Sequence, residues 1–122
     1  MTTDLSAEDV KLVRLARAAR LRAYTPHGAV PEGAAVRDTD GRTYAGATVD
    51  HADPALVTSA LRVAVATAAS SGARAFGSAV VVSDAPEGGA DTAGMALLAE
   101  FGSGIPVVVA GPDGTVRRSV ST

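Results

Sequence analysis

The chain has 122 residues, no cysteine and a formal net charge of −2. This length suits one domain over residues 1–122, the lack of cysteine excludes thiolate metal sites, and the charge gives no general attraction to nucleic acid or acidic membranes. The N-terminal segment is polar, and no stretch approaches the roughly 18 apolar residues that span a membrane. We therefore expect a soluble, cytoplasmic protein.

Ser6 precedes the first predicted helix, which continues to about Ala23. Ser6 is a good N-cap, and Asp9 stands three residues later in the place of a capping-box acid. Apolar residues at helical spacing predict a buried stripe: Leu12, Leu15, Ala16, Ala19 and Ala23. Basic residues repeat at every third position: Lys11, Arg14, Arg17 and Arg20. A solvated face is the simpler interpretation of this repeat, and binding of an anionic partner is the alternative.

Two strands joined by a tight turn are predicted next. Ala34–Arg37 and Arg42–Thr48 flank the sequence Asp-Thr-Asp-Gly, which is a hairpin signal with a glycine for the left-handed position. Two later apolar runs are typical of strands buried on both faces, and a Gly-Pro-Asp-Gly turn introduces a short last strand: Ser78–Val82, Ile105–Ala110 and Thr115–Arg117.

The middle helix is expected at Val57–Ala69, with Asp53 as its cap and Pro54 in its first turn. The segment is apolar on nearly every side, so we predict that it is buried nearly all round. Arg62 is its unusual residue, because a charge inside a buried helix is costly unless it is paired.

A third helix is expected to begin at a cap supplied by Asp91 or Thr92 and to end near Gly102. The order of elements is then α-β-β-α-β-α-β-β. This order predicts an α/β fold class, with a mixed β-sheet that carries helices on both faces. The sequence contains no internal repeat and no sign of a second domain.

The middle helix also carries a family resemblance. Its segment Thr58–Ala64 resembles the Cys-Ala-Glu-Arg motif of small zinc-dependent cytidine deaminases, with Ser59 in the place of Cys and Leu61 in the place of Glu. The segment at 23–28 is similar to the family's Ala-Tyr-x-Pro-Tyr-Ser, and further family positions follow in order: Gly33, Ala34, Ala35, Asp40, Gly41, Tyr44 and Gly46. The resemblance implies a cytidine-deaminase-like three-layer domain.

In these deaminases three His or Cys ligands hold a zinc ion that activates water, and a Glu that is not a ligand shuttles the proton. The resemblance places the first ligand at Ser59 and the Glu at Leu61. The later ligand positions, depending on the register, are one of two pairs: Asp91 and Gly94, or Thr92 and Met95. Neither pair suits zinc, so the resemblance implies a degenerate member with no metal, no cofactor and no catalytic residue.

The surroundings of the missing site keep some polarity. The family's ribose-holding Asn-x-Glu falls on Thr48 and Asp50, whereas its aromatic residue near the base falls on Val30. We predict a vacated pocket formed by four residues: Thr48, Asp50, Ser59 and Arg62. The predicted partner of Arg62 is a carboxylate of Asp50 or Asp91, and an anion or other ligand is the alternative.

Three functions remain open at this point. The first is a catalytically inactive cytidine-deaminase-like protein with an interaction or assembly role, forming a homo-oligomer (dimer or tetramer, since the family is typically tetrameric) or binding a protein partner. The second is a binding module for a nucleoside, nucleotide or anion in the vacated pocket. The third is an enzyme with metal-free chemistry. Nucleic acid is not an expected partner.

Overall fold

The computed structural model describes residues 5–85 and 87–122. Its helices and strands follow the predicted order, with one additional short 3₁₀ helix, η1: α1 (Ala7–Arg20), β1 (Glu32–Asp38), β2 (Thr43–Ala47), η1 (Pro54–Leu56), α2 (Ala60–Ser70), β3 (Phe76–Ser83), α3 (Thr92–Ala99), β4 (Pro106–Ala110) and β5 (Val116–Ser121).

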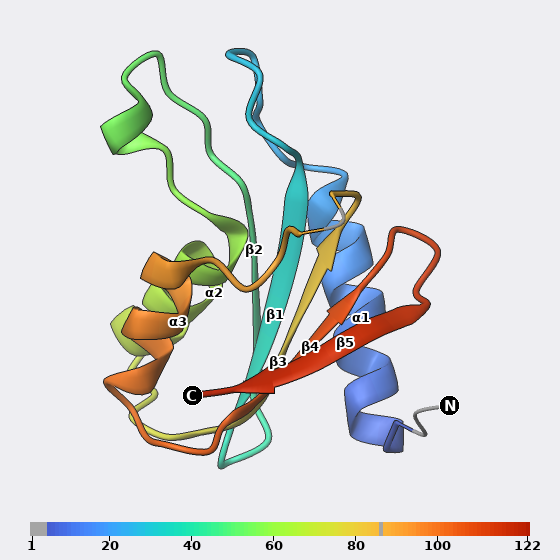
Figure 1. The fold of residues 1–122 in the computed structure, drawn as a ribbon. Helices are drawn as coiled ribbons and strands as arrows, with labels where there is room; N and C mark the ends of the chain where they lie inside the picture. The colour runs from blue at the N-terminus through green and yellow to red at the C-terminus, as the bar shows by residue number, and fades with distance from the viewer. Residues whose placement is uncertain (1–4, 86) are drawn as a thin grey trace.

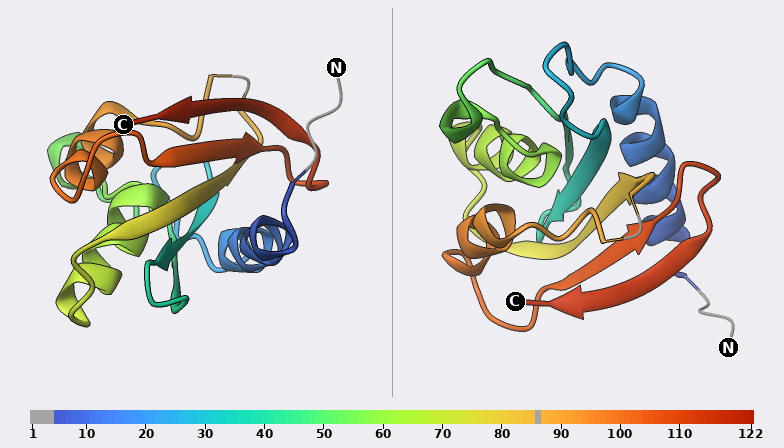
Figure 2. Two further views of the ribbon diagram at one scale, coloured as in Figure 1. Left: turned by 90° about the horizontal axis from the view of Figure 1, so that it is seen from below. Right: turned by 45° about the horizontal axis from the view of Figure 1, so that its top comes forward.

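The strands form a five-stranded mixed sheet in the order β2-β1-β3-β4-β5. β3 and β4 run parallel, and the other neighbouring strands pair antiparallel. Helix α1 covers one face of the sheet, and α2 and α3 lie on the opposite face (Figures 1 and 2). This arrangement confirms the predicted three-layer α/β fold.

The core is divided into two clusters because alternate residues of a strand point to opposite faces of the sheet. Val36 and Val81 pack toward α2 and α3, whereas Val80 and Val82 pack toward α1. Close approach of α2 to β2 depends on Gly46, since a Cβ atom there would lie 2.6 Å from the backbone nitrogen of Ala64. Small side chains thus bring the layers together.

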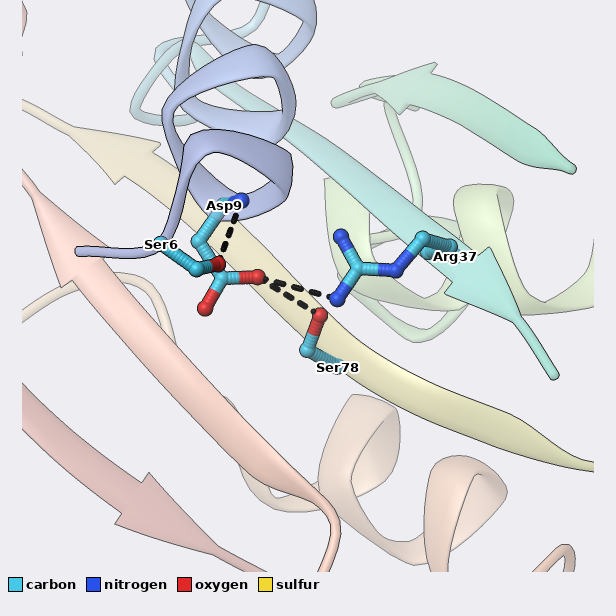
Figure 3. A network of polar contacts seen from close by, with 4 residues as sticks. All are labelled: Ser6, Asp9, Arg37 and Ser78. Carbon is cyan, nitrogen blue, oxygen red and sulfur yellow. Dashed lines mark hydrogen bonds and ion pairs between the residues drawn. The ribbon is translucent and has the colours of Figure 1, made fainter. Parts of the chain in front are cut away.

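The start of α1 is tied to the sheet by a polar network (Figure 3). The Oγ of Ser6 accepts a hydrogen bond from the backbone N–H of Asp9 at 3.1 Å, as predicted for an N-cap. The Asp9 carboxylate does not reach back to the cap. It instead accepts hydrogen bonds from Arg37 Nη2 at 3.2 Å and from Ser78 Oγ at 3.0 Å, which joins α1 to β1 and β3.

The predicted start of the middle helix is wrong. Asp53 caps η1 instead, and Ser59 caps α2 by accepting a hydrogen bond from the backbone N–H of Arg62 at 3.2 Å. The two helices are separated because Thr58 forms a β-bridge with Val49, which holds the chain extended there. The expected burial on nearly all sides is also wrong, since one side of α2 is exposed: Ala66, Thr67 and Ser70.

Other boundaries differ because of long-range pairing. Helix α1 ends at Arg20 rather than near Ala23, and by Tyr24 the chain is already paired, with its N–H donating to the carbonyl of Thr48 at 2.9 Å. Leu15 does not belong to the buried stripe, because 37% of its surface is exposed. β5 is longer than predicted, since it pairs along the whole of β4. None of the described helices is long and apolar enough to cross a membrane.

Candidate functional site

Helices α2 and α3 contact each other through the residues at their N-terminal ends. Asp91 caps α3, with its Oδ2 accepting a hydrogen bond from the backbone N–H of Gly94 at 2.8 Å. Gly94 is buried against Leu61 of α2, and a Cβ atom on Gly94 would lie 2.9 Å from the Leu61 Cβ. The missing side chain of Gly94 therefore makes the space that Leu61 occupies.

Leu61 is part of the hydrophobic core. Its side chain has no exposed surface, and it belongs to the cluster that α2 and α3 form with the sheet. The Oδ1 of Asp91 is also buried nearby and has no hydrogen-bond partner among the described residues. The first turns of α2 and α3 thus pack on each other through apolar atoms, and Asp91 Oδ1 is buried next to this contact.

Thr48 and Asp50 lie on either side of Val49, whose β-bridge to Thr58 brings this segment beside the start of α2. Both side chains are buried, with 4% and 5% of their surfaces exposed. Thr48 Oγ1 accepts a hydrogen bond from the backbone N–H of Glu32 at 3.0 Å. The side chain of Thr48 therefore supports the backbone of the neighbouring strand.

The Asp50 carboxylate is surrounded by backbone N–H groups. Its Oδ2 accepts hydrogen bonds from His27 at 2.7 Å and Ala29 at 3.2 Å, and its Oδ1 accepts one from His51 at 2.8 Å. Burial raises the pKa of Asp50, but these hydrogen bonds outweigh it and hold the pKa below its usual value. Asp50 is consequently ionised at neutral pH and fixes the loop that contains His27 and Ala29.

The predicted ion pair of Arg62 is wrong. Arg62 is half-buried in the first turn of α2, and within the described part of the chain it forms no ion pair with Asp50 or Asp91. Asp50 is already occupied by backbone N–H groups, and Asp91 uses one oxygen for its cap. The topology brings Ser59 and Arg62 together on one turn, but the four predicted pocket residues are not linked by hydrogen bonds to one another, except through the Ser59 cap.

Glu32 is a residue that the sequence reasoning did not single out. Its Oε2 accepts a hydrogen bond from Ser83 Oγ at 2.6 Å. Burial raises the pKa of Glu32 above its usual value, and the charge of Asp91 adds to this effect, while hydrogen bonds from Ser83 and from the backbone of Gly89 oppose it. The available signal was an acid directly before the apolar run Gly33–Val36.

The chain is similar to known cytidine deaminases in both sequence and structure. The family model described as Cytidine deaminase-like matches residues 5–114. The chain belongs to the cytidine deaminase-like family. It is 32% identical over 112 residues to a cytidine deaminase of Sporosarcina psychrophila, a match that covers 89% of this chain and 82% of the relative.

Solved structures of cytidine deaminases have the same fold. The crystal structure from Burkholderia pseudomallei superposes with a TM-score of 0.83 at 30% identity, covering 96% of this chain and 93% of that chain. The crystal structure from Mycobacterium leprae gives a TM-score of 0.75 at 24% identity, covering 93% of each chain. The second likeness concerns the fold alone.

The side chains at the positions that the sequence resemblance assigns to the family's zinc site do not suit a zinc ion. Ser59 offers a neutral hydroxyl that already caps α2, and Leu61 cannot accept a proton. In one register of the later ligands Gly94 offers no donor, and in the other Thr92 and Met95 offer only a hydroxyl and a thioether. Asp91, a ligand position in the first register only, is the one carboxylate among these residues. No group of three His, Cys, Asp or Glu residues able to hold a metal occurs among the described residues.

Two hollows lie elsewhere on the surface. The first, of about 260 Å³, lies between the β1–β2 turn and the segment after α2, and it is lined by polar and small residues that include Asp38, Tyr44 and Arg74. The second, of about 340 Å³, lies between α1 and the start of β2. Neither hollow contains Thr48, Asp50, Ser59 or Arg62.

Proposed function

We propose that residues 1–122 form a single cytidine deaminase-like domain that has no deaminase activity and acts through assembly or through a protein partner. The observation that carries this proposal is the packing of Leu61 on Gly94. A fully buried leucine stands where the resemblance places the proton-shuttling Glu, and it contacts Gly94, which is a ligand position in one of the two registers that the resemblance allows. The region is packed as core.

The chemical consequence follows from what the replaced groups supply. A positioned acid–base group contributes about 10²–10⁴-fold to a rate, and a zinc ion supplies the nucleophile by lowering the pKa of its bound water. Leu61 cannot act as an acid or a base, and Ser59 with Asp91 is a poor donor set for a zinc ion. Both contributions are lost together, which favours an inactive domain over one with altered specificity.

The test of this proposal is the deamination of cytidine, followed by ultraviolet absorbance with added zinc. We expect no turnover above the uncatalysed rate. The cytidine deaminase of Sporosarcina psychrophila, assayed in the same buffer, is the positive control. Zinc-dependent turnover by this chain would refute the proposal.

Self-association is the proposed form of assembly. Tyr24 and Val49 are paired in a β-bridge and are 59% and 46% exposed, and Leu56 of η1 is 57% exposed. Exposed apolar residues that gather on one surface are typical of protein interfaces. We expect light scattering to give the mass of a dimer or tetramer; a monomer of 12.1 kDa at high concentration would contradict this part of the proposal.

A ligand-binding role for the vacated pocket is the second candidate, and one observation favours it. Arg62 is half-buried and lacks an ion pair among the described residues, so an anion is a suitable partner for its guanidinium. Under this candidate, Thr48, Asp50 and Ser59 shape the pocket. Phosphate or cytidine monophosphate should then raise the Tm of the wild type and not that of Arg62→Ala. Equal Tm values with and without these ligands would exclude it.

A further inference from the structure

The solvent-facing side of α1 and its C-cap Leu21 carry a strip of cations and apolar residues, here called the basic strip: Val10, Lys11, Arg14, Leu15, Arg17 and Leu21. From position 10 to position 23 the sequence contains no acidic residue. Lys11, Arg14 and Arg17 are exposed, and none of them forms an ion pair with a described residue. The positive charge of the strip is therefore not compensated along the helix.

The acids that precede the strip do not change this. Asp9 is bonded to Arg37 and Ser78, so its charge is already paired. Glu8 lies in the first turn of α1, where the helix dipole favours a negative charge. Arg17 lies in the last turn of α1, where the helix dipole stabilises a positive charge. Lys11 and Arg14 lie in the middle of the helix, where the dipole does not stabilise their charges.

A hollow of about 340 Å³ opens beside the strip, between α1 and the first residue of β2. Its lining consists of Lys11, Arg14, Leu15 and Thr43. Leu15 is 37% exposed, and the long stems of lysine and arginine are apolar while their ends are charged. The hollow thus offers an apolar surface with two cations beside it. This chemistry suits an apolar side chain that is flanked by carboxylates.

Two other kinds of anionic partner fit less well. A helix that binds a membrane surface inserts its apolar face, but the apolar face of α1 is already packed on the sheet through Leu12, Val13, Ala16 and Ala19. Single-stranded nucleic acid is bound by aromatic residues on which bases stack, and the strip contains none.

We propose that the basic strip is a docking surface for an acidic polypeptide segment of another protein. Carboxylates of the segment pair with Lys11 and Arg14, and an apolar side chain between them enters the hollow beside Leu15. The strip lies on the face of the sheet opposite to α2 and α3 (Figure 2). This inference therefore does not depend on whether the chain has deaminase activity, and either conclusion can fail without the other.

The test uses a short synthetic peptide in which leucine residues are flanked by glutamates, with binding to the full chain followed by fluorescence anisotropy and mapped by backbone amide chemical shifts. We expect shifts along α1 and at Thr43, and an affinity that falls with added salt. Arg14→Glu should weaken binding about tenfold or more, because it places a like charge opposite the peptide. Leu15→Ser, or a peptide with serine in place of leucine, should weaken it by a smaller factor.

Arg118→Glu is the matched control, since Arg118 is an exposed cation of β5 that lies outside the basic strip, with its Nη2 donating to the carbonyl of Gly88 at 3.0 Å. It should bind the peptide like the wild type, and circular dichroism should show that all variants are folded. Failure of the peptide to bind, or equal binding by Arg14→Glu, would overturn the proposal. Tighter binding of an oligothymidine than of the peptide would also overturn it, and would indicate a nucleic-acid partner. Tighter binding of phosphatidylserine vesicles would likewise overturn it, and would indicate a membrane surface.

Discussion

Two regions of this molecule stand where the sequence resemblance places the family's site, and they differ in what their side chains contact. At the starts of α2 and α3, Leu61 and Gly94 form a buried apolar contact. At the segment from Thr48 to Asp50 the side chains remain polar, yet both are buried and bonded to backbone N–H groups. A polar residue at a site position is thus no evidence of a free binding group until its hydrogen-bond partners have been counted.

The largest expected effect is at the apolar region. Leu61→Glu places a carboxylate in the core without a partner, which should cost roughly 3–5 kcal/mol of the free energy of unfolding. Leu61→Met, which conserves volume, should cost less than about 1.5 kcal/mol. Urea denaturation of both variants measures this difference. If Leu61→Glu were as stable as Leu61→Met, the region would be a solvated pocket rather than core.

A smaller effect is expected at the polar region from Thr48→Val. This variant keeps the shape of the side chain but leaves the backbone N–H of Glu32 without its side-chain acceptor, at a cost of about 1–3 kcal/mol. Thr48→Ser retains the hydroxyl and serves as the control. A valine variant as stable as the wild type would indicate that the hydroxyl is available to a ligand.

The pH dependence of stability probes Asp50 directly. Its pKa is lower in the folded chain than in the unfolded chain, so the unfolded state binds more protons as the pH falls. The contribution of Asp50 is present above its unfolded pKa of about 3.9 and is lost as the pH falls through the folded value. Asp50→Asn should therefore show a shallower decline of Tm below about pH 4. An unchanged decline would show that Asp50 is not held by its backbone partners.

The smallest effect is expected from Arg62→Ala. Because Arg62 is half-buried and has no ion pair among the described residues, its removal should change the free energy of unfolding by less than about 1 kcal/mol. Thermal denaturation in a buffer without phosphate measures this. A loss as large as that of Leu61→Glu would reveal an internal partner and would remove the basis of the ligand-binding candidate.

The fold could be predicted from sequence because its signals are local. Apolar runs such as Val80–Val82 and the Asp-Thr-Asp-Gly turn define strands, and Ser6 marks a helix start; all of these are borne out. The start of α2 could not be predicted in the same way, since Asp53 and Ser59 are both good caps. The bridge between Val49 and Thr58 decides between these two caps, because it holds Thr58 in extended backbone directly before Ser59. Val49 lies outside the helical pattern, so the pattern alone does not reveal this bridge.

The candidate site was harder to predict for the same reason. The substitutions at Ser59 and Leu61 can be read from the sequence, but the contact of Leu61 with Gly94 requires the packing of two helices. The partners of Asp50 are backbone groups, which no residue type reveals. Glu32 has a raised pKa only because the fold buries it near Asp91 and Ser83.

The zinc content of the purified protein tests the central claim most directly. We expect elemental analysis to find no stoichiometric zinc in the wild type, because no suitable donor set stands at the starts of α2 and α3. A variant carrying Ser59→Cys, Leu61→Glu, Asp91→Cys and Gly94→Cys is the control, and it should bind about one zinc per chain if it folds. About one zinc per chain in the wild type would contradict the account, whatever the control shows.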